Sequence, residues 1–572
     1  MSHSPWAPPV LSRHESLLFG PTLDQLIPPD DEMREFDRRL RAAVDWRPWE
    51  ARYHLKRGQP PIHPRLVAGA ILWGLLKGAR SSRAVEESTK RRIDVLWFLE
   101  GRTLDNTTVC NFRLRFGAEL AGLMEALGQA AAGAAPQGGR TVAVDGTRIR
   151  ANSARTGART AERLRARLAA LAEKREALLA AMARRDAAED LEEALETPDE
   201  ALDEAGAQAL RRQIATLDAP RAKVARALTV AQERDAAKQA KDGPRATAVR
   251  VPVTDPEAYV LPHKEGGFGT NWTVSLATDA ASHAVLEARG VEGAEEVAAL
   301  APAIEAVRRL DGRAPAALLV DGNYPTGPAL RMAEGEGVAL VAPSAPPVHP
   351  AVARADLSQP VEAERQKDLP MEGRGEKARL SRQAFVYDAS NDCYYCPHGR
   401  VLRRVAHETR RDKRGQTAER WRYQSSSCAG CPLASRCWQG QAKGRTIIRD
   451  EYQPERDRLA RRMDDPAAHE LYRQRAPAVE GVFGYVKSVL GVRQFFYRGV
   501  EKVTQEWRWI CAAYNLRLLL RRGRKPAAAG ASRGANRSGG SLPRRRSLAA
   551  ALEFAAFALR RALAPVATSR AA

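Results

Sequence analysis

Cysteine is scarce in this sequence, and long apolar runs are missing from it. The chain has 7 Cys in 572 residues, too few for a disulfide scaffold, and the spacing of five of them is typical of reduced thiols in a cytosol. The most apolar early run, Leu66 to Leu76, is about half of the ~20 residues that a membrane-spanning helix needs. A later run, Leu548 to Val566, is interrupted by charged residues: Glu553, Arg560 and Arg561. We therefore expect no disulfide-rich and no membrane-spanning protein.

The first residues also lack the charged-then-apolar order of a secretory signal. What the sequence has instead is an excess of positive charge: 91 Lys+Arg against 69 Asp+Glu, a formal net charge of +22. A hydrophobic fraction of 44% is ordinary for a globular protein and excludes disorder throughout. Clustered basic side chains release counterions from phosphate backbones. The composition therefore predicts a globular cytoplasmic protein of roughly three or four structural units with a polyanionic partner.

Residues 1–130 show helical periodicity and are expected to form a helical N-terminal domain. Helices are predicted over Leu66–Lys77 and Thr103–Phe116, with basic residues at positions 90–92 between them. Two interpretations stay open. Short capped helices of this kind are typical of a helix-turn-helix DNA reader, and they fit a small helical bundle with a solvated basic face equally well.

Strand and helix patterns alternate over residues 140–344, which predicts a mixed α/β sheet with covered faces. Residues 156–245 interrupt this pattern with a helical insertion rich in Ala, Arg, Glu and Leu. Pro198 and Pro220 are expected to divide the insertion into about three helices. Its first part carries an apolar seam of the coiled-coil type: Leu164, Leu168, Leu171, Leu178 and Met182.

Three segments make up the remainder of the chain. Residues 345–460 form a Cys-rich basic insertion, and helical patterns over 461–520 are expected to complete the α/β core. Residues 521–572 are predicted to be a flexible basic tail with a short apolar helix. Because residues 521–548 hold nine basic and no acidic side chains, this stretch cannot bury a core and should be attracted to DNA.

Two carboxylates follow apolar strand patterns in the same way. Asp145 is preceded by Val-Ala-Val and Asp321 by Leu-Leu-Val, and each is followed by glycine. An Asp at the carboxyl end of a buried strand lies where α/β sheets bind ligands, although a single Asp-Gly is more often a tight turn. Hard oxygen ligands of this kind suit Mg²⁺ or Mn²⁺ and not zinc.

A third carboxylate, Glu480, lies in an expected helix. Seven residues make nearly two helical turns, so Glu480 and Lys487 should project about 20° apart on an α-helix. The adjacent apolar stripe is Val479, Phe483 and Val486. Periodicity alone favours an ordinary surface helix.

The acidic motifs together resemble a known family. Asp145 in Val-Asp-Gly-Thr, Asp321 in Val-Asp-Gly-Asn-Tyr and the run Tyr-x₂-Arg-x₄-Glu-x₆-Lys are similar to motifs of bacterial insertion-sequence transposases of the Asp-Asp-Glu (DDE) type. The resemblance extends to residues 57–66, 81–83 and 104–113, which are similar to the helical N-terminal domain of these enzymes. Related transposases usually have three residues between this Arg and Glu, whereas this chain has four. One of the four is Pro477, which should kink the helix or mark its start.

This resemblance implies a ribonuclease H-like catalytic core, with the first Asp on the first strand, the second after the fourth, and the Glu on a later helix. It implies that Asp145, Asp321 and Glu480 hold two Mg²⁺ or Mn²⁺ ions ~3.5–4 Å apart. The residues that would contact phosphates are Tyr472, Arg475 and Lys487.

The implied activity is cleavage at the ends of an insertion sequence and their joining to target DNA. The implied partners are double-stranded DNA, as terminal repeats and as target, and a second copy of the chain in a homodimer, associated with the nucleoid in the cytoplasm. A non-enzymatic DNA-binding descendant of a transposase is the alternative, and a stand-alone metal-dependent nuclease is a third. The presence of all three acids favours an active enzyme.

Five cysteines have the spacing of zinc ligands. Two Cys-x₂-Cys pairs are separated by 31 residues, and a fifth Cys follows. Tetrahedral zinc coordination needs paired Cys on tight turns, and Pro, His, Gly and Ala residues supply such turns within and beside the pairs. The alternative is a set of reduced structural thiols. The predicted zinc candidates are Cys393, Cys396, Cys428, Cys431 and Cys437.

Overall fold

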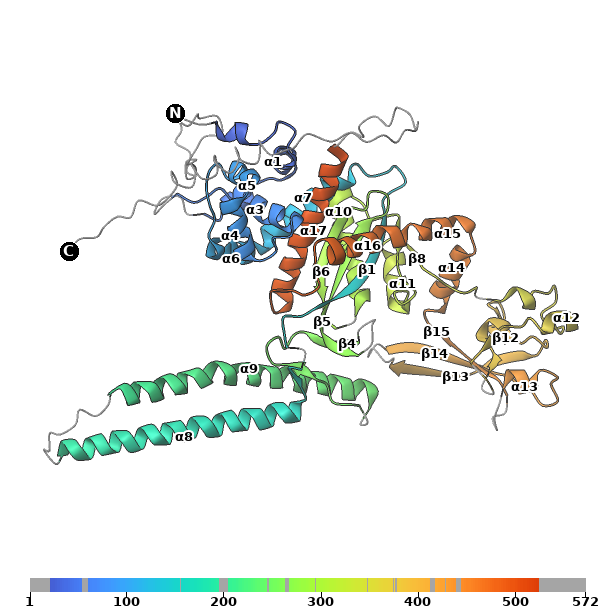
Figure 1. Ribbon diagram of the computed structural model, residues 1–572. Helices are drawn as coiled ribbons and strands as arrows, with labels where there is room; N and C mark the ends of the chain where they lie inside the picture. Colours follow the sequence, from blue (N-terminus) through green and yellow to red (C-terminus); the bar gives the residue numbers. More distant parts are fainter. Residues whose placement is uncertain are drawn as a thin grey trace, which may run out of the picture. The chain divides into compact units, whose positions relative to one another are not determined.

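The computed structural model of the protein separates into two compact units (Figure 1). Within the described residues, one unit comprises 21–74, 82–110 and 517–523, and the other comprises 75–81 and 111–516. The structure describes residues 21–523 except for 54–59, 155, 195–203, 244–245, 263–266, 294, 347, 374, 376–377, 412–416, 427 and 439–443.

Helices alone form the described part of the chain between residues 21 and 132, as the periodicity predicts. They are η1 (Leu23–Leu26), α1 (Glu32–Ala43), α2 (Arg47–Glu50), α3 (Pro64–Leu76), α4 (Ser82–Arg91), α5 (Ile93–Phe98), α6 (Asn106–Arg115) and α7 (Gly117–Ala132). Helix α1 begins after Asp31, whose carboxylate accepts a hydrogen bond from the Met33 backbone N–H at 2.8 Å. Helix α3 approaches the Phe98 ring closely at Gly69, because a Cβ at this position would lie 2.2 Å from the ring.

The second unit contains a six-stranded mixed sheet. Its strands are β1 (Thr141–Arg150), β4 (Tyr259–Pro262), β5 (Phe268–Asp279), β6 (Val285–Val291), β7 (Ala317–Leu319) and β8 (Ala339–Val341). The order is β4-β5-β1-β7-β8, and β6 also pairs with β5. Strand β1 is antiparallel to β5 and parallel to β7, and β7 is parallel to β8. The predicted mixed α/β sheet is therefore confirmed.

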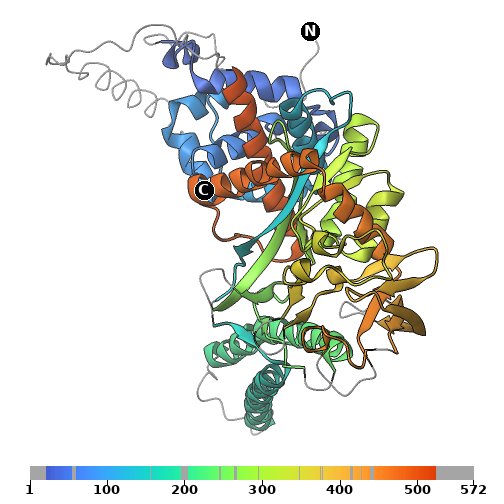
Figure 2. The same cartoon turned by 90° about the vertical axis from the view of Figure 1, so that its right-hand side faces the viewer.

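Helices pack on this sheet through buried side chains, and Figure 2 shows helices of the C-terminal part of the chain beside the long strands β1 and β5. The helical segments are η2 (Glu296–Ala299), α10 (Leu300–Asp311), α11 (Gly327–Gly335), α14 (Gln453–Met463), α15 (Pro466–Arg473), α16 (Arg475–Gly484) and α17 (Val500–Gly523). Trp507 of α17 donates from Nε1 to the Ser275 carbonyl at 2.9 Å. Asn515 satisfies both backbone groups of Val285, at 2.8 and 2.7 Å. These bonds fix α17 on β5 and β6.

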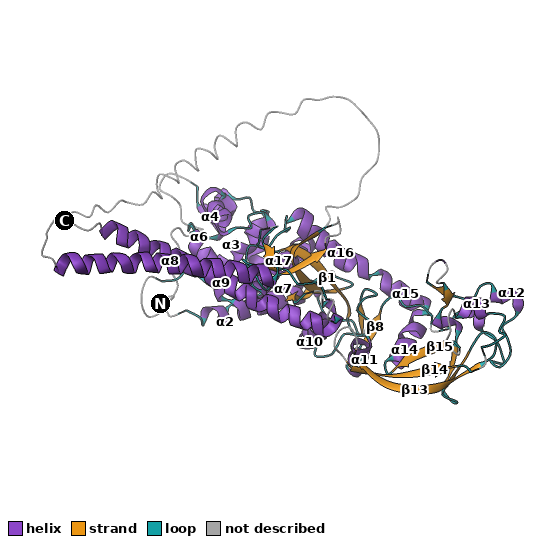
Figure 3. Cartoon of the chain, turned by 90° about the horizontal axis from the view of Figure 1, so that it is seen from below, coloured by secondary structure: helices purple, strands orange, loops and turns teal. Residues whose placement is uncertain are grey.

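Two long helices, α8 (Ala161–Ala194) and α9 (Glu204–Asp242), lie side by side (Figures 1 and 3). At their base, β2 (Ala158–Arg159) pairs with β3 (Val251–Pro252). The expectation of three helices is wrong, because Pro220 lies inside α9. A proline in a helix interior costs about 3 kcal/mol. Burial of an apolar face that α9 shares with α8, mostly after Pro220, offsets this cost, and Leu217 before Pro220 is also buried. The residues of this face include Ala161, Leu164, Val224, Ala227 and Ala231.

A second sheet, which the sequence patterns did not predict, lies in the Cys-rich segment and has Cys393 on one strand. It is antiparallel and five-stranded: β11 (Val386–Asp388), β12 (Cys393–Tyr395), β13 (Val401–Arg411), β14 (Thr417–Gln424) and β15 (Thr446–Asp450). Smaller elements beside it are η3 (Pro350–Val352), α12 (Ala363–Gln366), β9 (Met371–Glu372), β10 (Arg379–Leu380), η5 (Arg382–Ala384) and α13 (Ala434–Cys437). We call this sheet and these elements the Cys-rich sheet module. It has an apolar core of its own that includes Val352, Leu380, Tyr394 and Leu402.

Two expectations concern membranes and the chain end. No helix in the described part of the chain is long and apolar enough to cross a bilayer. The predicted basic tail begins at residues 521–523, which end α17; the rest of the tail, with its expected apolar helix, lies outside the described residues.

Candidate active site

Two of the predicted acids lie at equal offsets on neighbouring parallel strands. Ala143 of β1 pairs with Leu319 of β7, and Asp145 and Asp321 each follow two residues later. The expectation that Asp145 ends its strand is wrong, because β1 continues to Arg150 in pairing with β5. The same pairing excludes a tight turn at Asp145. Since β7 ends at Leu319, Asp145 lies beside the loop that carries Asp321.

Glu480 reaches the same region from α16. This helix packs on β1 and β5, with Glu480 exposed and with buried residues that include Ala478, Val479 and Val482. Burial raises the pKa of Asp145, and the negative charges of Asp321 and Glu480 raise it further. Asp321 and Glu480 thus both lie within electrostatic range of Asp145.

Arg475 is the counter-ion of Asp145. Its Nη2 lies 2.9 Å from Asp145 Oδ2, and the two side chains are only 11% and 18% exposed. The positive charge of Arg475 lowers the pKa of Asp145 and so opposes the effect of burial. Arg475 is the first residue of α16, after a break at Gln474, and Pro477 follows in the first turn. A proline there loses no helical hydrogen bond, and Pro477 marks the start of the helix as expected.

The two other residues of the Tyr-Arg-Glu-Lys run also face this region. Burial raises the pKa of Tyr472, which belongs to α15, and the charges of Asp321 and Asp145 raise it further. Lys487 lies in η6 (Tyr485–Val489), which is a π-helical turn, and its Nζ donates to Thr147 Oγ1 on β1. The expected angle of about 20° between Glu480 and Lys487 assumed an α-helix. The π-helical turn changes the angle between the two side chains about the helix axis. Such turns are frequent at functional sites.

One further acid in this region, Glu296, was not predicted. Its carboxyl group lies against Gly146, where an added Cβ would be 2.9 Å from Glu296 Cδ. Burial raises the pKa of Glu296, and the charges of Asp145 and Asp321 raise it further. Glu296 begins the short helix η2, and its sequence neighbourhood has no motif that marks it. Only the tertiary structure places it beside Asp145.

Tyr324 was also missed, although it is part of the Asp-Gly-Asn-Tyr motif that follows β7. It is 1% exposed, and its hydroxyl has no hydrogen-bond partner among the described residues. Burial raises the pKa of Tyr324, and the charges of Glu296 and Asp145 raise it further. Its position next to Asp321 was the available signal.

An open hollow of about 1090 Å³ adjoins the acids. Thr147, Lys487 and Glu296 line it on the side of the acids. Its other lining residues include Arg148, Arg150, Arg493 and Phe268, and Phe268 is 74% exposed. A hollow with this excess of positive charge suits a phosphate backbone.

The acids do not yet form a metal site as they stand. No group of three His, Cys, Asp or Glu side chains in the described residues is arranged to hold a metal ion. One carboxylate oxygen of Asp145 is occupied by Arg475. The donor set of Asp145, Asp321 and Glu480 nevertheless consists of hard oxygens, which fit Mg²⁺ or Mn²⁺.

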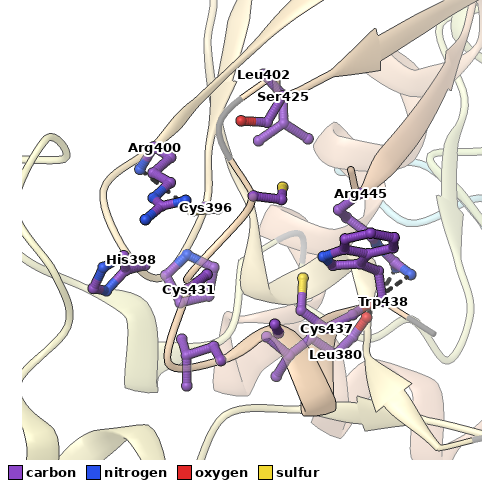
Figure 4. A pocket seen from close by; sticks show the side chains of 14 residues that line it. Leu380, Cys396, His398, Arg400, Leu402, Ser425, Cys431, Cys437, Trp438 and Arg445 are labelled. Atoms are coloured by element: carbon purple, nitrogen blue, oxygen red, sulfur yellow. Dashed lines mark hydrogen bonds between the residues drawn. The ribbon is translucent and has the colours of Figure 1, made fainter. Parts of the chain in front are cut away.

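Four of the five predicted zinc candidates lie together, in the Cys-rich sheet module. Cys396, Cys428, Cys431 and Cys437 line one small cavity (Figure 4). Cys393 does not line it and instead pairs with Arg403 in the β12–β13 ladder. The candidate set of five is thus reduced to four.

Comparison with protein families identifies two segments of the chain. Residues 395–520 match the family described as Transposase DDE domain, and residues 21–115 match the Transposase domain (DUF772). Comparison with curated proteins and with solved structures gives no significant match. The first matched segment spans the whole Tyr-Arg-Glu-Lys run and the four clustered cysteines, and the second spans the N-terminal helices. Both matches support the resemblance to DDE-type insertion-sequence transposases: the chain is similar to a transposase DDE domain over residues 395–520 and to a transposase domain over residues 21–115.

Proposed function

We propose that this protein cleaves the ends of an insertion sequence and joins them to target DNA by phosphoryl transfer, with Asp145, Asp321 and Glu480 as its metal-binding catalytic residues. The observation that carries this function is the shared electrostatic site of the three acids, since Asp321 and Glu480 both raise the pKa of Asp145. The matched transposase domains support an enzyme that acts on DNA.

The order of the strands supports a ribonuclease H-like core. Leaving aside the short edge strand β4, the sheet reads β6-β5-β1-β7-β8, which is 3-2-1-4-5 in chain order, with only the second strand antiparallel to both neighbours. Asp145 then lies on the first strand, Asp321 after the fourth and Glu480 on a later helix. This is the placement that the resemblance to DDE transposases implies.

The acids fit a pair of divalent ions. Burial raises the pKa of Asp145, the charges of Asp321 and Glu480 add to this rise, and Arg475 lowers it. A divalent cation bound to the carboxylates would favour their charged forms further. When bound, two such ions supply an activated nucleophile and stabilise the leaving oxygen. Asp321 and Glu480 are exposed, so ions can reach them from solvent.

Basic side chains on two sides of the acids would bind the DNA strand. Arg475, beside Asp145, can donate two parallel hydrogen bonds from its guanidinium group to a phosphate. Lys487 is oriented by its bond to Thr147 and adds a second positive charge. Tyr472 borders the same region and would contact the DNA. The basic hollow continues this surface and offers a path for the phosphate backbone away from the acids.

Double-stranded DNA is the partner, as terminal repeat and as target. We assign recognition of the repeat to the N-terminal helices, because they match a transposase domain and include basic residues such as Lys90 and Arg91. Joining two ends requires both ends to be held at once, so the working form is a homodimer on DNA.

The test is Mg²⁺-dependent cleavage of DNA that carries the element's own ends. We expect Asp145→Asn, Asp321→Asn and Glu480→Gln each to lose cleavage while retaining DNA binding. Removal of one transition-state contact lowers a rate by about 10²–10³-fold, and loss of a metal ligand should cost at least that much. Glu470→Gln is the matched control, because Glu470 lies on the neighbouring helix α15 and forms an exposed pair with Arg473.

The outcomes separate the alternatives. Cleavage at the normal rate by any of the three variants would show that the site is wrongly assigned. Cleavage without joining would indicate a nuclease, and binding without cleavage by the unmodified protein would indicate a non-enzymatic descendant.

A further inference from the structure

The four clustered cysteines surround a space that fits one small ion. The cavity between Cys396, Cys428, Cys431 and Cys437 has a volume of about 20 Å³, slightly more than the ~10–15 Å³ that holds one water molecule. Figure 4 shows Cys396, Cys431 and Cys437 around this cavity. All four are free thiols. The space is too small for an organic substrate, so a single ion is the fitting occupant.

Cys396 belongs to the first Cys-x₂-Cys pair and lies on a tight turn that presents backbone N–H groups to its sulfur. The Gly399 N–H donates to the Cys396 carbonyl at 2.9 Å, and the Arg400 N–H donates to Cys396 Sγ at 3.3 Å. Gly399 has a φ of +76°, which favours glycine. N–H bonds to sulfur stabilise a thiolate, which is the form that binds metal.

Cys428 and Cys431 form a second turn of the same kind. The Cys431 N–H donates to the Cys428 carbonyl at 3.3 Å, and Gly430 between them has a φ of +67°. Space around the sulfur of Cys428 is kept open by Gly444, where a Cβ would lie 2.9 Å from Sγ. Cys437 completes the group from the end of α13.

The four thiol groups line the same small cavity. As thiolates, their four negative charges would disfavour one another, and the two arginines that also line the cavity, Arg400 and Arg445, carry only two positive charges. A divalent cation with a preference for sulfur removes this repulsion.

We propose that Cys396, Cys428, Cys431 and Cys437 bind one Zn²⁺ in a tetrahedral four-thiolate site, and that Cys393 is not a ligand. As noted above, no group of three ligand side chains in the described residues is already arranged for a metal, so binding requires the thiols to rotate about their Cα–Cβ bonds. The rotation is local, since all four already line one cavity.

Four protein ligands leave no open position on zinc, so the ion has a structural role. It joins the turn after β12, the loop after β14 and helix α13, which lie beside one apolar core that includes Tyr394, Leu402 and Leu433. The ion thereby closes the 31-residue stretch between Cys396 and Cys428. We expect the Cys-rich sheet module to lose its fold when zinc is removed.

Cys393 provides a matched control. It is buried at 2% exposure on β12 and lies three residues before Cys396. It is therefore a cysteine of the same module that is buried like Cys437 and does not line the cavity.

The experiment measures zinc in the purified full chain by mass spectrometry and then the absorption of the Co²⁺-substituted protein. We expect about one Zn²⁺ per chain in the unmodified protein and in Cys393→Ser, and sulfur-to-cobalt charge-transfer bands with tetrahedral d–d bands. Cys428→Ser and Cys437→Ser should retain less than about a tenth of the zinc. Asp145→Asn should retain all of it, which makes the outcome independent of DNA cleavage.

Two results would overturn the site: absence of zinc from the unmodified protein after purification with Zn²⁺, or loss of zinc from Cys393→Ser with retention in Cys437→Ser. If the ligand variants are insoluble, stepwise modification of the unmodified protein with a mercurial reagent decides the question. Release of one zinc together with reaction of four mutually protected thiols supports the site, and zinc-independent reaction of all thiols contradicts it.

Discussion

Arg475 forms an ion pair with Asp145 and is the largest influence of a neighbouring charge on the pKa of Asp145. The two groups lie 2.9 Å apart, and Arg475 lowers a pKa that burial raises. Without this arginine, Asp145 would bind a proton more tightly and the phosphate would lose a bidentate partner. Both changes weaken the chemistry that we propose.

We therefore expect Arg475→Gln to lower the single-turnover cleavage rate by about 10²–10³-fold, with a smaller effect on DNA binding. Arg473→Gln is the control, because Arg473 lies two residues earlier, is 77% exposed and pairs with the exposed Glu470. Equal cleavage rates for the two variants would contradict the assigned role of Arg475.

At this scale, the sequence predicts some neighbours and misses others for a physical reason. Asp145 lies on β1 and Asp321 follows β7, each two residues beyond a paired position of these parallel strands, and the apolar run before each Asp marks both in the sequence. Glu296 comes from a short helix that no periodicity marks, and it reaches Asp145 only because Gly146 leaves room for its carboxyl group. Cys393 has the spacing of a zinc ligand, but it lies in the β12–β13 ladder and does not line the cavity of the other four cysteines; spacing alone does not reveal this difference.

Among the elements, α9 shows how packing overrides a local signal. Pro220 predicts a break, but the helix continues because its apolar face remains buried against α8. The Cys-rich sheet module is the other element that the sequence did not reveal. Its strands β13 and β14 are rich in charged residues and lack the clean apolar alternation by which strands are identified.

The helix pair should depend on Leu164, which is fully buried on α8. We expect Leu164→Ala to destabilise the pairing of α8 with α9 by about 2–5 kcal/mol, because it leaves a cavity in the seam. Hydrogen exchange of the α8 and α9 amides measures the effect. Leu179→Ala on the same helix should be nearly neutral, since Leu179 is 39% exposed, and similar exchange rates in both variants would refute the seam.

Helix α17 carries a buried charge whose titration should be visible in stability. Glu506 accepts hydrogen bonds from the N–H groups of Phe496 and Tyr497 at 2.9 and 3.1 Å, and Arg80 lies 3.4 Å from it. Burial raises the pKa of Glu506 above its ordinary value, although these contacts lower it. The folded protein therefore holds this proton more tightly than the unfolded chain does.

A raised carboxyl pKa contributes stability that is fully present below the ordinary pKa near 4.5 and is lost as pH rises through the raised value. We expect the free energy of unfolding to fall with pH over this window, and Glu506→Gln to make the fall shallower. Urea unfolding at a series of pH values measures it. Burial also raises the pKa of Glu287, so part of the decrease of stability with pH should remain in Glu506→Gln. If the variant and the unmodified protein lose stability with pH equally, Glu506 does not titrate in this range.

At the level of the whole molecule, the matched segments and the predicted acids lie in different parts of the sequence. The matched transposase segments lie at residues 21–115 and 395–520, while Asp145 and Asp321 lie between them. Within the second unit, the matched segment 395–520 meets the strand that carries Asp145, because α16 packs on β1 and β5. A composition with a net charge of +22 then adds attraction to DNA that does not depend on base sequence.

The basic tail is expected to contribute to this sequence-independent attraction to DNA. Residues 524–548 hold seven Lys and Arg and no acidic residue, and each side chain that neutralises a phosphate adds about 0.9 to the slope of log binding constant against log salt concentration. We expect a chain ending at residue 523 to bind all DNA sequences more weakly and with a slope shallower by up to about 6. A full-length variant with these seven residues replaced by Gln is the control for length. If charge is the cause, this variant behaves like the truncated chain; if its slope equals that of the unmodified protein, the tail does not contact phosphates, and the +22 charge acts through the folded units.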